Sequence, residues 1–249
     1  MGLSLRASSK TARPAAGAAA GSAYTYFQQV MDRYGTAMMG GGSMMGHAAF
    51  ESIMGGASAP GWMRGSSLPG AMMGDSTDPG EVMGSLFANA PGARVSAASA
   101  GGLAMKVPSG ATVERSSNTI LFAGRTVGFA VVSSPAGADD RFEVAGLIDP
   151  TIVIPVGTLV TIEMLNGDAA SAHGLVIADA GASGSSVPMM SSQAAFTNSA
   201  IWFLGDPTSA GLHAATMTFT ARAVGTYQYL CPVPTHAQKG MSGILIVRA

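Results

Sequence analysis

Three residues near the end of the chain combine sulfur and nitrogen donors at a regular spacing. Cys231, His236 and Met241 follow one another at five-residue intervals in the segment Cys-Pro-Val-Pro-Thr-His-Ala-Gln-Lys-Gly-Met. Thiolate, imidazole and thioether groups suit copper, and two histidines with one cysteine and a weak axial methionine make a blue-copper site. The segment therefore predicts a mononuclear copper site that needs one more histidine.

The other histidines of the chain are His47, His173 and His213. His173 opens the apolar stretch His-Gly-Leu-Val-Ile-Ala, which is typical of a strand. A β-sandwich can bring the start of such a strand beside a later loop. His213 lies in a segment that we expect to be a loop, and we expect it not to be a ligand.

Several kinds of reactive site are excluded by the same residues. Cys231 is the only cysteine, which excludes an intramolecular disulfide, a multi-cysteine zinc or iron–sulfur site and a binuclear copper centre with two cysteines. The His-Cys-His pairing of multicopper oxidases is absent. Four protein ligands would leave no position for a substrate, so we expect a protein that is not an enzyme.

The composition argues against nucleic acid as a partner and against a transmembrane helix. Only 11% of the 249 residues are charged, against ~25% in an average soluble domain. The formal charge of −1 gives no basic field for nucleic acid. No apolar run is long enough for a transmembrane helix.

From Ala111 onward the pattern favours short strands separated by Gly and Pro turns, and no convincing helix. Alternation is clearest at Val160, Ile162 and Met164. An antiparallel sandwich or barrel is therefore expected. The expected strands are Thr119–Phe122, Thr126–Ser133, Arg141–Val144, Thr151–Pro155, Leu159–Asn166, His173–Ala178, Ala215–Ala221, Gly225–Cys231 and Gly243–Val247.

Residues 111–249 resemble the rusticyanins, a family of small blue-copper cupredoxins. The resemblance rests on Gly225-Thr-Tyr-Gln-Tyr-Leu-Cys231, the C-x4-H-x4-M spacing, Ile152-Val-Ile-Pro155-Val-Gly157 and the segment from Asn166 to His173. It implies an all-β Greek-key sandwich that holds one type 1 copper ion. It assigns the equatorial ligands to His173, Cys231 and His236, and the axial ligand to Met241. Gly174 departs from the family, which has a serine there, so the family's high potential is not carried over.

Residues 1–110 fall outside this resemblance. The first 23 residues are expected to be a leader or a weak secretory signal. Large apolar groups on one helical face predict a short helix over 24–34. A Met/Gly-rich segment over 35–110 contains units such as Met38-Met39-Gly40 and is expected to be mostly irregular, with a linker over 93–109. Two domains are therefore expected, 1–110 and 111–249.

Two functions remain open. The first is electron transfer on one copper ion that cycles between Cu(I) and Cu(II), with a redox protein such as a cytochrome or an oxidase as partner. The second is copper storage, resistance or delivery, in which the Met-rich segment captures Cu(I). For either, we expect a monomer in an extracytoplasmic location, the periplasm or the outer cell surface.

Overall fold

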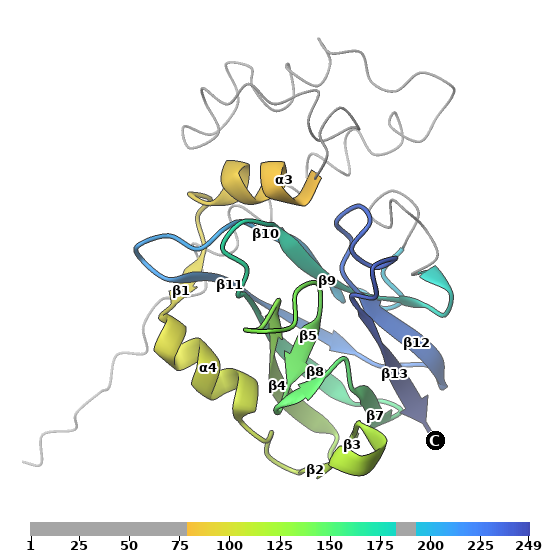
Figure 1. Cartoon of the computed structure of the whole chain (residues 1–249). Helices are drawn as coiled ribbons and strands as arrows, with labels where there is room; N and C mark the ends of the chain where they lie inside the picture. The colour runs from red at the N-terminus through yellow and green to blue at the C-terminus, as the bar shows by residue number, and fades with distance from the viewer. Residues whose placement is uncertain (1–78, 183–192) are drawn as a thin grey trace, which may run out of the picture.

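The computed structural model describes residues 79–182 and 193–249. These residues form a β-sandwich of two sheets with two short helices at its margin (Figure 1). The leader, the helix expected over 24–34 and the methionine pairs before Met83 lie outside the described residues. Within the described part of the chain, no helix is long and apolar enough to cross a membrane.

The first sheet has six strands in the order β1-β11-β8-β4-β5-β6. They are β1 (Ala93–Val95), β4 (Thr126–Ser133), β5 (Phe142–Val144), β6 (Leu147–Ile148), β8 (Leu159–Asn166) and β11 (Leu212–Thr220). β8 runs parallel to β4 and antiparallel to β11. Val160, Ile162 and Met164 of β8 are all buried, as their alternation predicts.

The second sheet has seven strands in the order β10-β9-β12-β13-β7-β3-β2. They are β2 (Ala111–Glu114), β3 (Thr119–Phe122), β7 (Thr151–Pro155), β9 (His173–Asp179), β10 (Ala200–Leu204), β12 (Gly225–Leu230) and β13 (Ser242–Arg248). β12 lies between β9 and β13 and is antiparallel to both. The start of β9, the end of β12 and the start of β13 therefore meet at one end of the sandwich.

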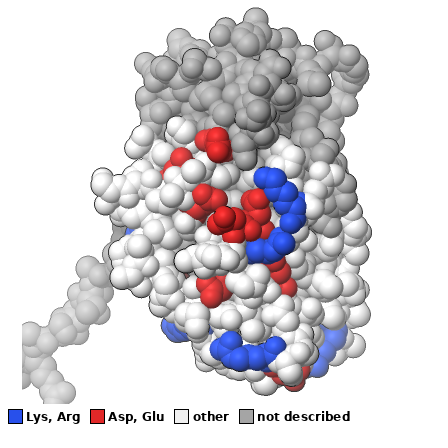
Figure 2. Space-filling model, viewed as in Figure 1, with Lys and Arg blue, Asp and Glu red and all other residues white. Residues whose placement is uncertain are grey.

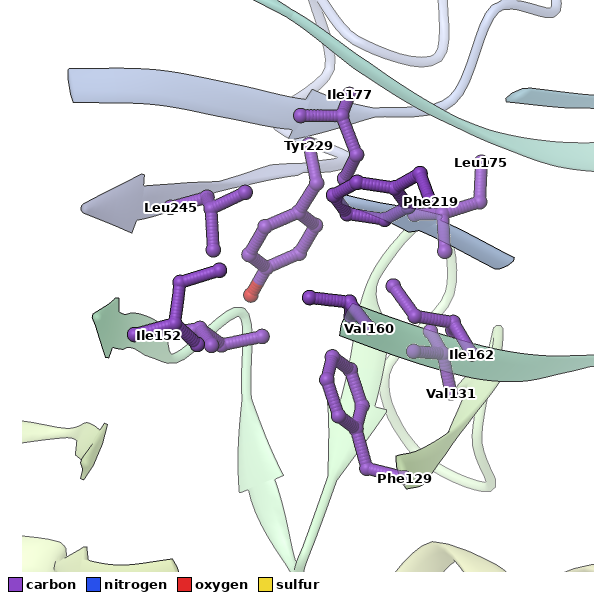
Figure 3. Close-up of a pocket in the computed structure, with 11 residues that line it drawn as sticks. Phe129, Val131, Ile152, Val160, Ile162, Leu175, Ile177, Phe219, Tyr229 and Leu245 are labelled. Atoms are coloured by element: carbon purple, nitrogen blue, oxygen red, sulfur yellow. The ribbon is translucent and has the colours of Figure 1, made fainter. Parts of the chain in front are cut away.

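Aromatic and branched side chains from both sheets fill the space between them (Figure 3). Phe129 and Val160 come from the first sheet, and Leu175 and Tyr229 come from the second. The Tyr229 hydroxyl donates to the carbonyl of Pro150 at 2.6 Å, so its polar atom is satisfied inside the core. Burial of each large apolar side chain contributes roughly 1.5–3 kcal/mol. This core fixes the strand ends that carry the site.

The β-sandwich expected from the sequence is confirmed, but its sheets are mixed rather than antiparallel, because β8 pairs in parallel with β4, and β7 pairs in parallel with β3 and β13. The bounds of β3, β4, β7 and β8 are those predicted. Four strands of the described region, β1, β2, β6 and β10, were not predicted. The loop expected around His213 is wrong, because that residue lies in β11 and pairs with Arg94 of β1.

The linker expected over 93–109 is also wrong. β1 pairs with β11, and helix α4 (Ala97–Met105) follows it. The Ser96 side chain caps this helix by accepting the backbone N–H of Ser99 at 3.2 Å. Ala100 and Ala104 pack against Leu165 of the sandwich. Small residues that look like a flexible stretch thus let the helix approach the sheet closely.

A second helix, α3 (Pro79–Phe87), begins at a Pro-Gly pair within the segment that we expected to be mostly irregular. Proline is favoured at the first position of a helix, where no backbone donor is needed. Met83 is buried in the main core, and the Phe87 ring lies 4.4 Å from that of Phe203, centroid to centroid. α3 lies across the same end of the sandwich as the strand ends described above (Figure 1).

Candidate metal centre

Three neighbouring strands of the second sheet position the predicted donors. His173 is the first residue of β9, Cys231 follows β12 directly, and Met241 immediately precedes β13. The antiparallel pairing of β12 with both neighbours places all three at one end of the sheet. His236 lies midway along the loop that joins Cys231 to Met241. Residues far apart in sequence are therefore adjacent because of the strand order.

His173, Cys231 and His236 form a compact triangle of donor atoms. The two Nδ1 atoms are 3.1 Å apart, and Cys231 Sγ lies 3.8 Å from Nδ1 of His173 and 3.6 Å from Nδ1 of His236. For a triangle with these sides, the point equidistant from its corners lies ~2 Å from each atom, which is the length of metal–nitrogen bonds. All three residues are buried, so the group fits a single metal ion.

Met241 is fully buried, and its backbone is hydrogen-bonded to two residues of this triangle. The backbone N–H of Cys231 donates to the carbonyl of Met241 at 3.1 Å, and the N–H of Met241 donates to the carbonyl of His236 at 3.0 Å. The loop is therefore closed on itself by hydrogen bonds between the predicted ligand residues. Pro232 and Pro234 further restrict its backbone.

The structure explains why residue 174 is a glycine and not the serine of the family. The N–H of Gly174 donates to Cys231 Sγ at 3.4 Å, so it contributes a hydrogen bond to the sulfur. A Cβ at this position would lie 2.6 Å from the carbonyl oxygen of Ile201 and would also collide with that of Trp202. The unpredicted strand β10 therefore leaves no room for any side chain here.

The outer nitrogen of His173 contacts two oxygen atoms. Asp168 Oδ2 lies 2.9 Å and Ser134 Oγ 3.0 Å from His173 Nε2. Neither residue was expected from the sequence. Asp168 is five residues before His173 in the β8–β9 connection, and only the fold shows that its side chain turns back onto the ring.

The pKa values of these groups follow from burial and from their contacts. Burial alone would lower the pKa of His173, but hydrogen bonds with Asp168 and Cys231 raise it to about 9. Burial would raise the pKa of Cys231, but hydrogen bonds from His173 and His236 lower it to about 6. The thiolate is thus favoured at neutral pH, and metal binding must displace a proton from the His173 imidazole.

Asp168 is likewise held in its ionised form. Burial would raise the pKa of this carboxyl, but hydrogen bonds from His173 and from the Ala170 N–H lower it to about 2. Nearby Asp206 behaves oppositely, because burial and repulsion from Asp168 and Glu81 raise its pKa to about 6. Acidic side chains gather on one face of the molecule, next to basic ones (Figure 2).

His236 is covered on its outer edge by helix α3. A Cβ built on Gly80 would lie 2.8 Å from His236 Nε2, so only glycine allows this approach. The N–H of Ala172, the residue before His173, donates to the carbonyl of Gly80 at 2.9 Å. On the other side of the ring, Asp140 Oδ1 lies 3.5 Å from His236 Nδ1. No pattern in the sequence predicts the contact with Gly80.

His213 is not part of the triangle. It is buried in β11, where its Nδ1 accepts the N–H of Gly205 at 3.2 Å and its ring donates to the carbonyl of Pro91. Both nitrogens therefore have backbone partners. Burial and the nearby charge of Arg94 lower the pKa of His213 to about 4, which keeps the ring neutral.

No protein-family model matches the chain. Among curated proteins, it is similar to rusticyanin from Acidithiobacillus ferrooxidans, with 30% identity over 138 residues, which cover 55% of this chain and 86% of the relative. Rusticyanin from Acidithiobacillus ferridurans is 30% identical over 134 residues, which cover 53% of this chain and 69% of that protein.

Solved rusticyanin structures share the fold. The chain matches reduced rusticyanin with a TM-score of 0.52 and 21% identity, over 63% of this chain and 99% of the other. A structure of rusticyanin from Thiobacillus ferrooxidans gives a TM-score of 0.52 and 24% identity, over 63% and 96%. Another, described as a copper protein, gives 0.54 and 22%, over 63% and 97%.

The sequence relationship and the fold thus agree with the chemistry of the donors. Two imidazoles and one thiolate lie together where the strands end, and this set of donors matches the copper site that the resemblance implies. The matches to these relatives cover only about half of this chain. The chain belongs to the rusticyanin family of type 1 copper proteins.

Proposed function

We propose that this chain is an electron carrier that holds one type 1 copper ion on His173, Cys231 and His236, with Met241 as the axial ligand. The observation that carries the proposal is the buried triangle of two Nδ1 atoms and one Sγ, with sides of 3.1, 3.6 and 3.8 Å. Copper bound there would supply one-electron chemistry between Cu(II) and Cu(I). Four protein ligands would leave no position for a substrate, which supports a carrier rather than an enzyme.

The residues of the site hold the donors in nearly fixed positions. Cys231 is 0% exposed and His236 is 1% exposed, so water is excluded from the donor atoms. The hydrogen bonds of the 231–241 loop and the strand ends on either side restrict movement of the ligands. A site that changes little between two oxidation states lowers the reorganisation that accompanies electron transfer.

The partner is proposed to be another redox protein, a cytochrome or an oxidase, that gives or takes one electron without forming a bond to this chain. An extracytoplasmic location, in the periplasm or at the outer cell surface, fits a thiophilic metal because cytosolic thiols would compete for copper. Fractionation of cells that make the native protein tests this location. Recovery from the cytosol alone would contradict it.

The copper-storage or delivery role has no observation in its favour. The methionine pairs that motivated it lie before residue 79, outside the described residues. Of the Met-rich segment, Met83 and Met105 are described: the Met83 side chain is buried in the core, and the Met105 side chain is 58% exposed.

The decisive experiment is a potentiometric titration of the copper-loaded chain followed by visible absorption. A carrier should lose and regain its colour reversibly, with a one-electron Nernst slope, and should keep its single copper throughout. A Cu(I) chelator present during the cycle should not remove the ion within one cycle. Loss of the copper on reduction, or several loosely bound Cu(I) ions, would contradict the proposal.

A further inference from the structure

A carboxylate faces the outer nitrogen of one of the proposed copper ligands. Asp168 Oδ2 lies 2.9 Å from Nε2 of His173, a side chain that is 0% exposed, while the Asp168 side chain is 24% exposed. An ionised carboxylate can only accept a hydrogen bond. Nε2 therefore carries the proton, and the lone pair of the neutral ring lies on Nδ1, which points toward Cys231 and His236.

The position of Asp168 is itself built by the surrounding chain. Its Oδ1 accepts the N–H of Ala170 at 2.9 Å, and its own N–H donates to Asn166 Oδ1 at 3.1 Å. Asn166 is buried at the end of β8, and its amide group donates to the carbonyls of Ser171, Leu204 and Gly205 at 2.9, 3.2 and 3.0 Å. The carboxylate is thus anchored to β8 and to the residues that follow β10.

Ser134 completes the surroundings of the outer nitrogen. Its hydroxyl lies 3.0 Å from His173 Nε2 and accepts the N–H of Asp140 at 3.1 Å. It also hydrogen-bonds to Asp168, which helps to hold the carboxylate in place. Two segments of the chain, one with Ser134 and one with Asp168, therefore converge on one ring nitrogen.

We propose that Asp168 is a positioning residue of the copper site, whose carboxylate orients His173 and strengthens its Nδ1 as a donor. A hydrogen bond from a ligand imidazole to a carboxylate raises the basicity of the ligand. A more basic imidazole, with a negative charge behind it, stabilises Cu(II) more than Cu(I). Asp168 therefore lowers the midpoint potential of the site. This inference rests on the proposed function.

Asp168→Asn is the test variant, because an amide keeps the shape and an oxygen acceptor but removes the charge. Asp139→Asn is the matched control, because it removes the same charge from an exposed residue in the neighbouring loop. We expect Asp168→Asn to shift the Cu(II)/Cu(I) equilibrium toward Cu(I) by at least tenfold, ~59 mV for a one-electron couple. Asp139→Asn should shift it several times less.

A second readout reports on the ring directly. Pulsed EPR detects the outer, non-coordinated nitrogen of each copper-bound imidazole through its quadrupole coupling. Asp168→Asn should change this signal for one of the two histidines, and Asp139→Asn for neither. A purely structural role would instead change the free energy of unfolding and leave the outer-nitrogen signal unaltered.

The possible outcomes separate the two claims. A type 1 spectrum in the unaltered protein, with equal potentials in Asp168→Asn and Asp139→Asn, would overturn the role of Asp168 and leave the proposed function standing. A raised potential and an altered outer-nitrogen signal in Asp168→Asn alone would support the role. An unaltered protein that shows no type 1 spectrum would overturn the proposed function and this inference with it.

Discussion

Two buried histidines, His173 and His213, differ in what their ring nitrogens contact. Both nitrogens of His213 are used by backbone groups, Gly205 on one side and Pro91 on the other. The outer nitrogen of His173 faces oxygen acceptors, and its Nδ1 faces Cys231 and His236. Two buried histidines are thereby divided into one proposed metal donor and one packing residue.

The first prediction compares variants of these two histidines. His173→Gly should leave a coordination position open and change the visible and EPR spectra of the copper-loaded chain, and added imidazole should restore them. His213→Ala should leave both spectra unaltered, although it removes a buried side chain. The prediction fails if His173→Gly retains the original spectrum or if His213→Ala loses it.

The second prediction concerns pH. The pKa of His213 is lowered from 6.5 to about 4 in the folded chain, so protonation of this ring opposes folding. The stability that the neutral ring contributes is fully present above pH ~6.5 and is lost as the pH falls toward 4. The loss amounts to about 3 kcal/mol, from 1.36 kcal/mol for each unit of pKa difference.

Denaturant unfolding of the unaltered chain and of His213→Gln measures this loss. The stability difference between them at pH 7 should shrink by about 3 kcal/mol at pH 4, since the variant has no ring to protonate. Other groups with shifted pKa values, such as Asp149 and Asp206, are common to both chains and cancel in the difference. A difference that stays constant with pH would refute the assignment.

At the scale of secondary-structure elements, helix α3 packs closely against the sandwich through two glycines. The carbonyls of Gly80 and Gly84 accept the N–H groups of Ala172 and Asp206 at 2.9 and 3.0 Å. A Cβ on either glycine would collide with the sandwich. The helix therefore lies close enough to cover the outer edge of His236.

Gly80→Ala tests this cover. The added methyl would overlap His236 Nε2 and Ser171 Oγ, so α3 must shift away at a cost of about 1–3 kcal/mol. A small inorganic reductant should then reduce the copper faster, because His236 becomes more exposed. Stopped-flow absorption measures the rate.

Gly101→Ala in helix α4 is the control, because a Cβ there has no atom within 4 Å. That change should stabilise the chain by roughly 0.5–1 kcal/mol and leave the reduction rate as it was. Equal rates in the two variants would show that α3 does not shield His236.

Some of these elements could be predicted from the sequence and others could not. Strands such as β8 were predictable because apolar and polar residues alternate along them. The metal-binding character of residues 231–241 was predictable because thiol, imidazole and thioether groups rarely occur together at such spacing. Helices α3 and α4 were not, because Pro79-Gly80 and the small residues around Gly101 resemble a flexible stretch unless their tertiary contacts are known. Asp168 and Ser134 were missed because their role depends on the fold and not on spacing.

At the scale of the whole molecule, the sandwich domain is proposed to begin before residue 111 and to include residues 79–110. β1 adds a strand to the first sheet. The Met83 side chain is buried in the core, and the Phe87 ring packs against that of Phe203. Residues 79–110 thus belong to the folded unit that carries the site.

Two truncated chains test this boundary. Residues 79–249 should fold and bind one copper with an unchanged spectrum. Residues 111–249 should be less stable by roughly 3–6 kcal/mol, since Met83 and Phe87 each contribute roughly 1.5–3 kcal/mol by burial. Urea unfolding measures the difference, and equal midpoints for the two chains would return the boundary to 111.

The central claim is that Cys231 supplies a thiolate to a type 1 copper ion, and one spectrum tests it most directly. The oxidised chain with one equivalent of copper should show an intense visible band from thiolate-to-copper charge transfer. Cys231→Ser should lose that band, because a hydroxyl is a harder and weaker donor, while the fold is retained. An intense band that persists in Cys231→Ser, or its absence from the unaltered chain, would contradict the assignment.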